Sequence, residues 1–334
     1  MNTLWFILVT ILFIGFFTLE GFDYGVGILL PFLGKKDVER RIIINTIGPF
    51  WDSNQVWMIT AGGAIFASFP QVYATLFSGA YLALILMLVG LILRGVSFEF
   101  RSRSDSSRWR NTWDWLLFLG SLIPAVLWGA VVGNLMRGLA IDDKMTYWGG
   151  LLPLLNPFAL LAGVTFVALF AMYGANLLIL RTTGQVEKRA KALAPRLWLV
   201  ATVLTVILVI WTFLATDILT KPGINGLIPA ILAAISLLLV GLFQRQGRYG
   251  WALVCSALTF VLATVMVFAG LYPRILISTL NPDYSLTIYN AASSPYTLRV
   301  MTIVAVIFVP VVLAYLFWTY KTFSKRIGEK DLGY

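Results

Sequence analysis

The feature that most constrains this chain is its series of apolar stretches, each about as long as a membrane helix. A helix needs about 20 consecutive apolar residues to cross the hydrocarbon core of a bilayer. Only 12% of the residues are charged, against about a quarter in soluble proteins. The sequence therefore predicts an all-α integral membrane protein. Nine transmembrane helices are expected, over residues 3–33, 44–68, 72–100, 112–139, 157–180, 197–216, 224–243, 251–271 and 296–320.

The basic residues predict how the chain is oriented in the membrane. They gather in the connections after the first, third, fifth and seventh spans and in the C-terminal tail. Because cytoplasmic connections of membrane proteins are rich in Lys and Arg, the N-terminus is expected outside and the C-terminus in the cytoplasm. This topology accounts for the net charge of +10 without nucleic-acid binding. The N-terminal run lacks a basic start and a small-residue cleavage site, so it is expected to remain as the first span.

A short internal similarity indicates how the spans are grouped. The sequence DYGVGILL at 23–30, late in the first span, resembles MYGANLLI at 172–179, late in the fifth. Both spans run from outside to inside, so a parallel repeat fits two four-helix bundles and one peripheral helix, with chance similarity as the alternative. A single membrane domain, 1–334, would then contain a first bundle at 1–140, a second at 150–275 and an additional helix at 296–323.

The composition limits the chemistry that the chain can perform by itself. It has no histidine, the usual ligand of haem, copper and zinc, and the usual general base. Its one cysteine, Cys255, lies in an apolar run and is expected to pack as a core residue. No P-loop, nucleophile elbow or dinucleotide-binding glycine motif is present. The sequence therefore predicts no metal or redox centre held by this chain alone.

Acidic residues in the first span are the first candidates for function. Glu20 and Asp23 are three residues apart and share one helix face. Gly21 and Gly25 form a G-x-x-x-G pattern, which is typical of closely packed membrane helices. With the predicted topology, Asp23 lies in the cytoplasmic part of the span.

The second span carries a further carboxylate at a similar expected depth. Asp52 and Gln55 share a face there, and Asn54 adds an amide. Carboxylates joined by amides on neighbouring antiparallel helices are typical of proton routes. The alternative is that Asp23 and Asp52 are structural, either capped or paired with an arginine, including one of another chain.

The remaining polar and aromatic residues of these spans have simpler interpretations. Arg94, near the end of the third span, is expected to extend to the cytoplasmic interface rather than to form an ion pair. Trp51 and Trp57 flank Asp52 and either shield it from lipid or line a path for a small apolar molecule. Gly62 and Gly63 are expected to serve helix packing. Glu99, Asp114 and three tryptophans mark the same interface, where an aromatic belt is predicted; the tryptophans are Trp109, Trp113 and Trp115.

Several motifs together resemble subunit II of cytochrome bd quinol oxidase. The resemblance extends over essentially the whole chain. Phe50 departs from the pattern, in which a histidine precedes the Trp-Asp pair, and this puts the details of the proton route in question. The motifs are GFDYGVG at 21–27, ERRIIIN at 39–45, WDSNQVW at 51–57, TAGG at 60–63, RWRNTWDW at 108–115, LNPF at 155–158, SLT at 285–287 and ASS at 292–294.

The resemblance implies a subunit of a terminal oxidase that takes electrons from membrane quinol and reduces oxygen to water. Haem b and haem d are then expected in a homologous subunit I, and none in this chain. The implied partners are that haem-bearing subunit in a heterodimer, a small single-helix subunit and membrane lipid. The implied location is the plasma membrane of a bacterium or archaeon.

The resemblance also implies roles for individual residues. The proton route would use Asp52 and Asp23, with Glu20, Gln55 and Asn54 alongside, and Trp57 matches a tryptophan near the proposed oxygen access. Two other classes of protein remain open on the residues alone. One is a proton-coupled secondary transporter, which an inverted repeat would favour. The other is an assembly scaffold whose acids are structural.

Overall fold

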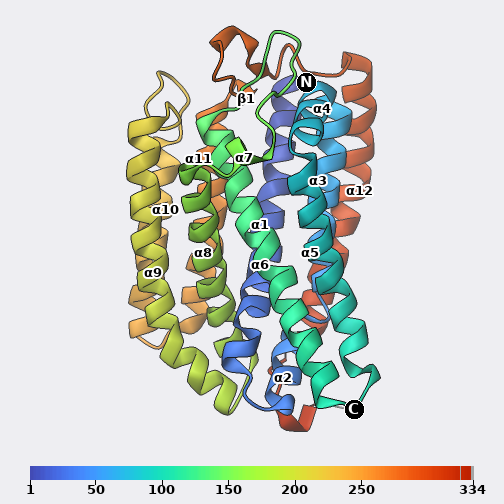
Figure 1. Ribbon diagram of the computed structural model, residues 1–334, viewed down its shortest axis with the longest axis vertical. Helices are drawn as coiled ribbons and strands as arrows, with labels where there is room; N and C mark the ends of the chain where they lie inside the picture. Colours follow the sequence, from blue (N-terminus) through green and yellow to red (C-terminus); the bar gives the residue numbers. More distant parts are fainter. Residues whose placement is uncertain (324, 332–334) are drawn as a thin grey trace.

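The computed structural model describes residues 1–323 and 325–331, which form a bundle of long helices lying side by side (Figure 1). Two short antiparallel strands, β1 (Arg274–Leu276) and β2 (Leu286–Thr287), pair at the end of the bundle where the N-terminus lies. Three short 3-10 helices are η1 (Arg101–Arg103), η2 (Pro282–Tyr284) and η3 (Glu329–Asp331). The α-helices are α1 (Asn2–Leu33), α2 (Asp37–Ile47), α3 (Trp51–Ser68), α4 (Pro70–Gly79), α5 (Tyr81–Phe100), α6 (Ser107–Arg137), α7 (Leu151–Leu154), α8 (Pro157–Arg181), α9 (Gln185–Ala215), α10 (Leu227–Arg245), α11 (Tyr249–Leu271) and α12 (Pro295–Thr322).

Eight helices among the described residues are long and apolar enough to cross a membrane: α1, α5, α6 and α8 to α12. The prediction of nine such spans is therefore corrected at the second one. The chain does not run as one helix over 44–68, because α2 ends at Ile47 and a new helix, α3, begins at Trp51. Helix α3 has only 18 residues and includes Asp52, Asn54 and Gln55, so it contains no stretch as apolar as those of the eight membrane-length helices.

One break in the helix lies between the second and third predicted spans, and another divides the third span itself. The backbone at Phe69 leaves the helical region, with φ −135° and ψ 64°, and Pro70 begins α4. Proline suits the first position of a helix, where its missing N–H group has no partner to lose. A second irregularity at Ala80 separates α4 from α5. The boundaries of the other spans follow the prediction within a few residues, except that α9 begins already at Gln185.

Helix α1 lies inside the bundle, in contact with α3, α6, α8 and α11. Its closest approach is to α8, where a Cβ atom on Gly25 would overlap the Phe170 carbonyl and lie 2.9 Å from the Gly174 backbone nitrogen. The two similar segments, 23–30 and 172–179, therefore lie against each other. Helices α5 and α6 pack on one side of this contact, and α9, α10 and α11 pack on the other. The division of the chain into two bundles stays a prediction.

Helix α12 lies at the edge of the bundle (Figure 1). Most of its apolar side chains are exposed. Near its start, the Trp5 indole N–H bonds the Leu298 carbonyl at 3.1 Å and the Thr302 hydroxyl at 3.2 Å. Near its end, the Tyr320 side chain contacts α3. Helix α12 is thus attached to the bundle at both ends, while its middle offers an apolar surface to lipid or to another protein.

Ion pairs connect the helices at the end of the bundle where the basic connecting segments gather. Asp114 accepts bonds from Arg40 at 2.8 Å and from Arg101 at 2.6 Å, and its side chain is fully buried. Asp114 of the predicted interfacial group thus pairs with two cations from other segments. Glu39 of α2 meets Arg189 of α9 at 2.7 Å. Burial raises the pKa of the Glu39 carboxyl, but the bonds from Arg189 and from two backbone N–H groups outweigh burial and lower that pKa.

Candidate functional site

Three charged side chains meet in the interior of the bundle. Arg94 of α5 donates a hydrogen bond from Nη1 to Oε1 of Glu20, and its Nη2 lies 3.9 Å from Oδ2 of Asp23. All three side chains are fully buried. The prediction that Arg94 extends to the interface is therefore wrong. Two carboxylates at its own depth stabilise the guanidinium, and its positive charge compensates in part for the removal of theirs from water.

Small residues and an aromatic ring shape this cluster. Helix α6 approaches α5 closely at Gly120, where a Cβ atom would lie 2.7 Å from the backbone nitrogen of Arg94. On α1, the ring centroid of Tyr24 lies 4.9 Å from the Arg94 guanidinium carbon. A ring face at this distance attracts a cation, most strongly away from water. The arginine is thus held by two acids and one aromatic face.

The net charge of the cluster would allow it to bind a proton. With all three groups ionised, two carboxylates face one guanidinium, so one negative charge is left over. Oε2 of Glu20 and Oδ1 of Asp23 are buried, and no protein group in the described residues donates a hydrogen bond to either. Leaving a buried acceptor without a donor costs free energy. A single added proton would neutralise the excess charge and satisfy one of these oxygens.

Asn54 connects α3 to the cluster. Its amide nitrogen donates to Oδ2 of Asp23 at 2.8 Å and to the Leu19 carbonyl at 3.1 Å. Its amide oxygen accepts the hydroxyl hydrogen of Tyr320 at 2.7 Å. The Asn54 side chain is therefore fully bonded, and it joins α3 to α1 and α12.

The structure does not bring Asp52 and Asp23 together. Residues two apart on a helix lie about 200° apart around its axis, so Asp52 and Asn54 occupy opposite sides of α3. Asn54 faces Asp23, whereas Asp52 is exposed on the surface of the chain, and no ion pair or hydrogen bond reaches its carboxylate from the described residues. Gln55 is half-buried, and its amide oxygen lacks a donor from the same residues.

The two tryptophans that flank Asp52 lie against different helices. Trp51 stacks on Phe98 of α5, with ring centroids 4.9 Å apart. Trp57 is half-buried, and its ring occupies the space beside Gly15 of α1, where a side chain would overlap it. Both rings thus fill gaps between α3 and its neighbours.

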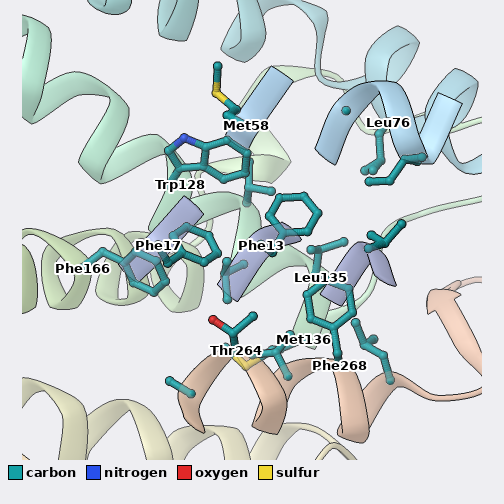
Figure 2. A pocket seen from close by; sticks show the side chains of 18 of the residues that line it. Phe13, Phe17, Met58, Leu76, Trp128, Leu135, Met136, Phe166, Thr264 and Phe268 are labelled. Carbon is teal, nitrogen blue, oxygen red and sulfur yellow. The ribbon is translucent and has the colours of Figure 1, made fainter. Parts of the chain in front are cut away.

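A second feature is an apolar cavity of about 880 Å³ between the helices. Figure 2 shows part of its lining, with Phe13, Phe17, Trp128 and Phe268 around the space and Thr264 among the few polar side chains. Gly62 and Gly63 also line it, and a Cβ atom on either would meet nothing within 4 Å. The helix packing predicted for these two glycines is therefore not made within this chain. The cavity is suited to an apolar molecule.

Sequence reasoning missed Arg94 and Tyr320 as members of the site. The signal for Arg94 was the charge balance, because two acids in one apolar span require a cation nearby. Tyr320 carries no local signal, since its contact depends on how α12 meets α3. The described residues contain no group of three Cys, His, Asp or Glu side chains arranged to hold a metal ion.

The fold and the cluster together define a class: a multi-pass, all-α membrane protein with ionisable groups buried among its helices. Residues 1–323 match the protein family described as cytochrome bd terminal oxidase subunit II. This match includes all of the residues that form the cluster and almost the whole chain. The chain belongs to this family of oxidase subunits.

Individual relatives agree with the family match. The chain is 40% identical to cytochrome bd ubiquinol oxidase subunit 2 of Bacillus subtilis (strain 168), over 99% of this chain and 98% of that protein. It is also 40% identical to cytochrome bd-I ubiquinol oxidase subunit 2 of Escherichia coli (strain K12), over 98% of this chain and 96% of the relative. The bd oxidase from Geobacillus thermodenitrificans contains a chain with the same fold, at a TM-score of 0.78 and 16% identity, over 96% of this chain and 98% of that one.

Proposed function

We propose that this chain is the haem-free subunit II of a cytochrome bd-type quinol:oxygen oxidoreductase, and that it provides part of the cytoplasmic proton route. The observation that carries the proposal is the buried cluster of Glu20, Asp23 and Arg94, in which two carboxylates face one guanidinium, so that one bound proton would balance the charge. Ionisable groups at membrane depth are costly, and they are typical of proton and ion pathways. Full-length relatives that are named as ubiquinol oxidase subunits support quinol as the substrate of the complex.

The partner in this proposal is a haem-bearing subunit I. This chain has no histidine to serve as an axial haem ligand, so haem b and haem d belong to the partner. Those haems would supply the oxygen chemistry when the complex is assembled. Subunit II then acts as a scaffold for subunit I and as a supplier of protons to it.

Asp52 marks the surface where the partner docks. Its carboxylate is exposed on a helix whose neighbouring side chains Val56 and Ile59 are also exposed, at 47% and 64%. A carboxylate facing lipid is strongly unfavourable, so we infer that protein covers this surface. Asp52 would then receive protons at the subunit boundary, and Asp23 with Glu20 would hold them further inside the bundle. Asn54 bonds Asp23 at the inner level, and Gln55, whose amide oxygen has no donor among the described residues, would extend the route from Asp52.

This arrangement explains how the oxidase charges the membrane. Reduction of oxygen consumes protons, and quinol oxidation releases them. If the consumed protons come from the cytoplasm and the released ones leave outside, charge is separated without a pump. Each charge moved across the membrane is worth about 2.3 kcal/mol per 100 mV. We also infer that Trp57, whose ring fills the space beside Gly15, borders the access of oxygen to the complex.

The proposal is tested with Asp52→Asn in the assembled complex, with Asp143→Asn at an exposed position outside the proposed route as the matched control. A reduced-minus-oxidised absorption spectrum reports whether haem b and haem d are incorporated. We expect normal haem content in both variants. Oxygen consumption per haem should fall about a hundredfold in Asp52→Asn only, which is at the lower end of what a positioned proton-transfer group contributes. Wild-type oxygen consumption in Asp52→Asn would instead support a purely structural scaffold.

A further inference from the structure

We propose that Tyr320 of α12 is a positioning residue of the proton route: its hydroxyl fixes the Asn54 amide, and this amide fixes the Asp23 carboxylate. The inference rests on the proposed route through Asp23 and adds a residue that lies 266 positions after Asn54 in the chain. It gives helix α12, which is otherwise largely exposed, a part in the function of the subunit.

The hydrogen bonds leave the Asn54 amide only one favourable orientation. Its nitrogen donates to the Asp23 carboxylate at 2.8 Å and to the Leu19 carbonyl at 3.1 Å, while its oxygen accepts from the Tyr320 hydroxyl at 2.7 Å. Turning the amide over would place its oxygen against two other acceptors. The hydroxyl of Tyr320 is the only donor to the amide oxygen among the described residues.

Aromatic packing holds the phenol in place. The Tyr320 ring stacks on Phe50 with centroids 4.5 Å apart and planes at 8°. Phe323 meets the Phe50 ring edge-on at 6.2 Å, and the Arg181 guanidinium lies 5.6 Å from the same ring.

The segment after α12 fastens this end of the helix to the second half of the chain. Arg326 donates to the carbonyls of Ile179 at 3.2 Å and Thr182 at 2.6 Å, and it pairs with Glu187 at 3.0 Å. The backbone N–H of Ile327 donates to the Arg181 carbonyl at 2.7 Å. These bonds restrain the position of α12 close to Tyr320.

The chemical consequence concerns which oxygen of Asp23 takes up a proton. A carboxamide does not titrate, so Asn54 orients its neighbour and does not carry the proton itself. The amide donates to Oδ2 of Asp23, whereas Oδ1 is buried and receives no hydrogen bond from the described protein groups. Oδ1 is therefore the oxygen that binds the proton. By preventing the Asn54 amide from turning, Tyr320 keeps its hydrogen bond on Oδ2 and leaves Oδ1 for the proton.

The test compares Tyr320→Phe with Tyr315→Phe in the complete complex. The first change keeps the ring on Phe50 and removes one hydroxyl, and the second removes a hydroxyl from a side chain of the same helix that is 57% exposed. Haem content, measured by the difference spectrum, should be normal in both. Oxygen consumption per haem should fall about tenfold in Tyr320→Phe, the effect of one lost hydrogen bond, and stay unchanged in Tyr315→Phe.

A double-mutant cycle separates positioning from a general structural effect. If Tyr320 acts through Asn54, adding Tyr320→Phe to Asn54→Ala changes oxygen consumption no further. A general effect on α12 would lower the activity in both backgrounds and would overturn the inference. If Tyr320→Phe does not assemble, Arg326→Ala replaces it, with a several-fold loss expected in the wild type and none in Asn54→Ala. Full activity of Arg326→Ala would then overturn the inference.

The outcome also separates this inference from the proposed function. If Asp23→Asn abolishes oxygen consumption and Tyr320→Phe leaves it at the wild-type rate, the proton route stands and the role of Tyr320 is refuted. If neither variant changes oxygen consumption, both the route through Asp23 and the role of Tyr320 are refuted.

Discussion

Replacing Arg94 by methionine tests how strongly the buried acids depend on one cation. The change removes the guanidinium that bonds Glu20, lies 3.9 Å from Asp23 and sits over the Tyr24 ring. Two carboxylates would remain in a fully buried place without a cation. Removing one partner of a buried ion pair costs about 3–5 kcal/mol. We expect a loss of stability within this range. Proton uptake by the carboxylates should reduce the loss, because it removes their unpaired charge.

The double variant Glu20→Gln with Arg94→Met decides whether the loss comes from the unpaired charge. The double variant removes both charges of the pair. Its loss of stability should therefore be about 2–3 kcal/mol smaller than the sum of the two single losses. Lys191→Met is the control, because the Lys191 side chain is 42% exposed and its ion pair with Glu187 is worth less than about 1 kcal/mol. The assay is the temperature at which the purified complex loses its haem spectrum. Equal stability of Arg94→Met and Lys191→Met, or strict additivity in the double variant, would refute the reasoning.

Three further predictions concern packing and charge. Gly25→Ala should destabilise the complex by about 1–3 kcal/mol, because its Cβ atom would overlap α8, whereas Gly63→Ala has open space and should be neutral in the same thermal assay. Arg189→Ala should cost about 1 kcal/mol at neutral pH. The ion-pair part of that cost should fade as the pH falls from 4.5 through the lowered pKa of Glu39, because its carboxyl stabilises the fold only while ionised, whereas the bond from Arg189 to the Leu33 carbonyl does not titrate. Burial lowers the pKa of Lys221 to about 8, so a membrane-impermeant amine reagent should label it increasingly as the pH rises through 8, and only from outside.

Much of the fold follows from the sequence because lipid requires long apolar helices. The spans that became α1, α6, α8, α10, α11 and α12 are each continuous and apolar, so length and hydropathy locate them. The second span was predicted too long, because the apolar residues of α2 run into α3 with no charged residue between them. The turn at 48–50 separates the two helices, and hydropathy alone does not reveal it.

The site was predicted in part, for a reason that lies in helix geometry. The three-residue spacing of Glu20 and Asp23 places them on one face of a helix that the sequence already identifies. The face of α3 that meets α1 depends on tertiary packing, and this packing turns Asn54 inward and Asp52 outward. Arg94 near the end of a span resembles an interfacial anchor until its depth relative to two acids is known. Contacts between distant helices decided these positions.

The most direct test of the account is the rate of proton uptake by the complex reconstituted in vesicles, recorded when oxygen is mixed with the quinol-reduced enzyme. Asp23→Asn is compared with the wild type at equal haem b and haem d content. Oxygen should still bind rapidly, while proton uptake from the cytoplasmic side should slow by about a hundredfold, as for loss of a positioned proton-transfer group. Uptake at the wild-type rate in a fully assembled Asp23→Asn complex would contradict the account.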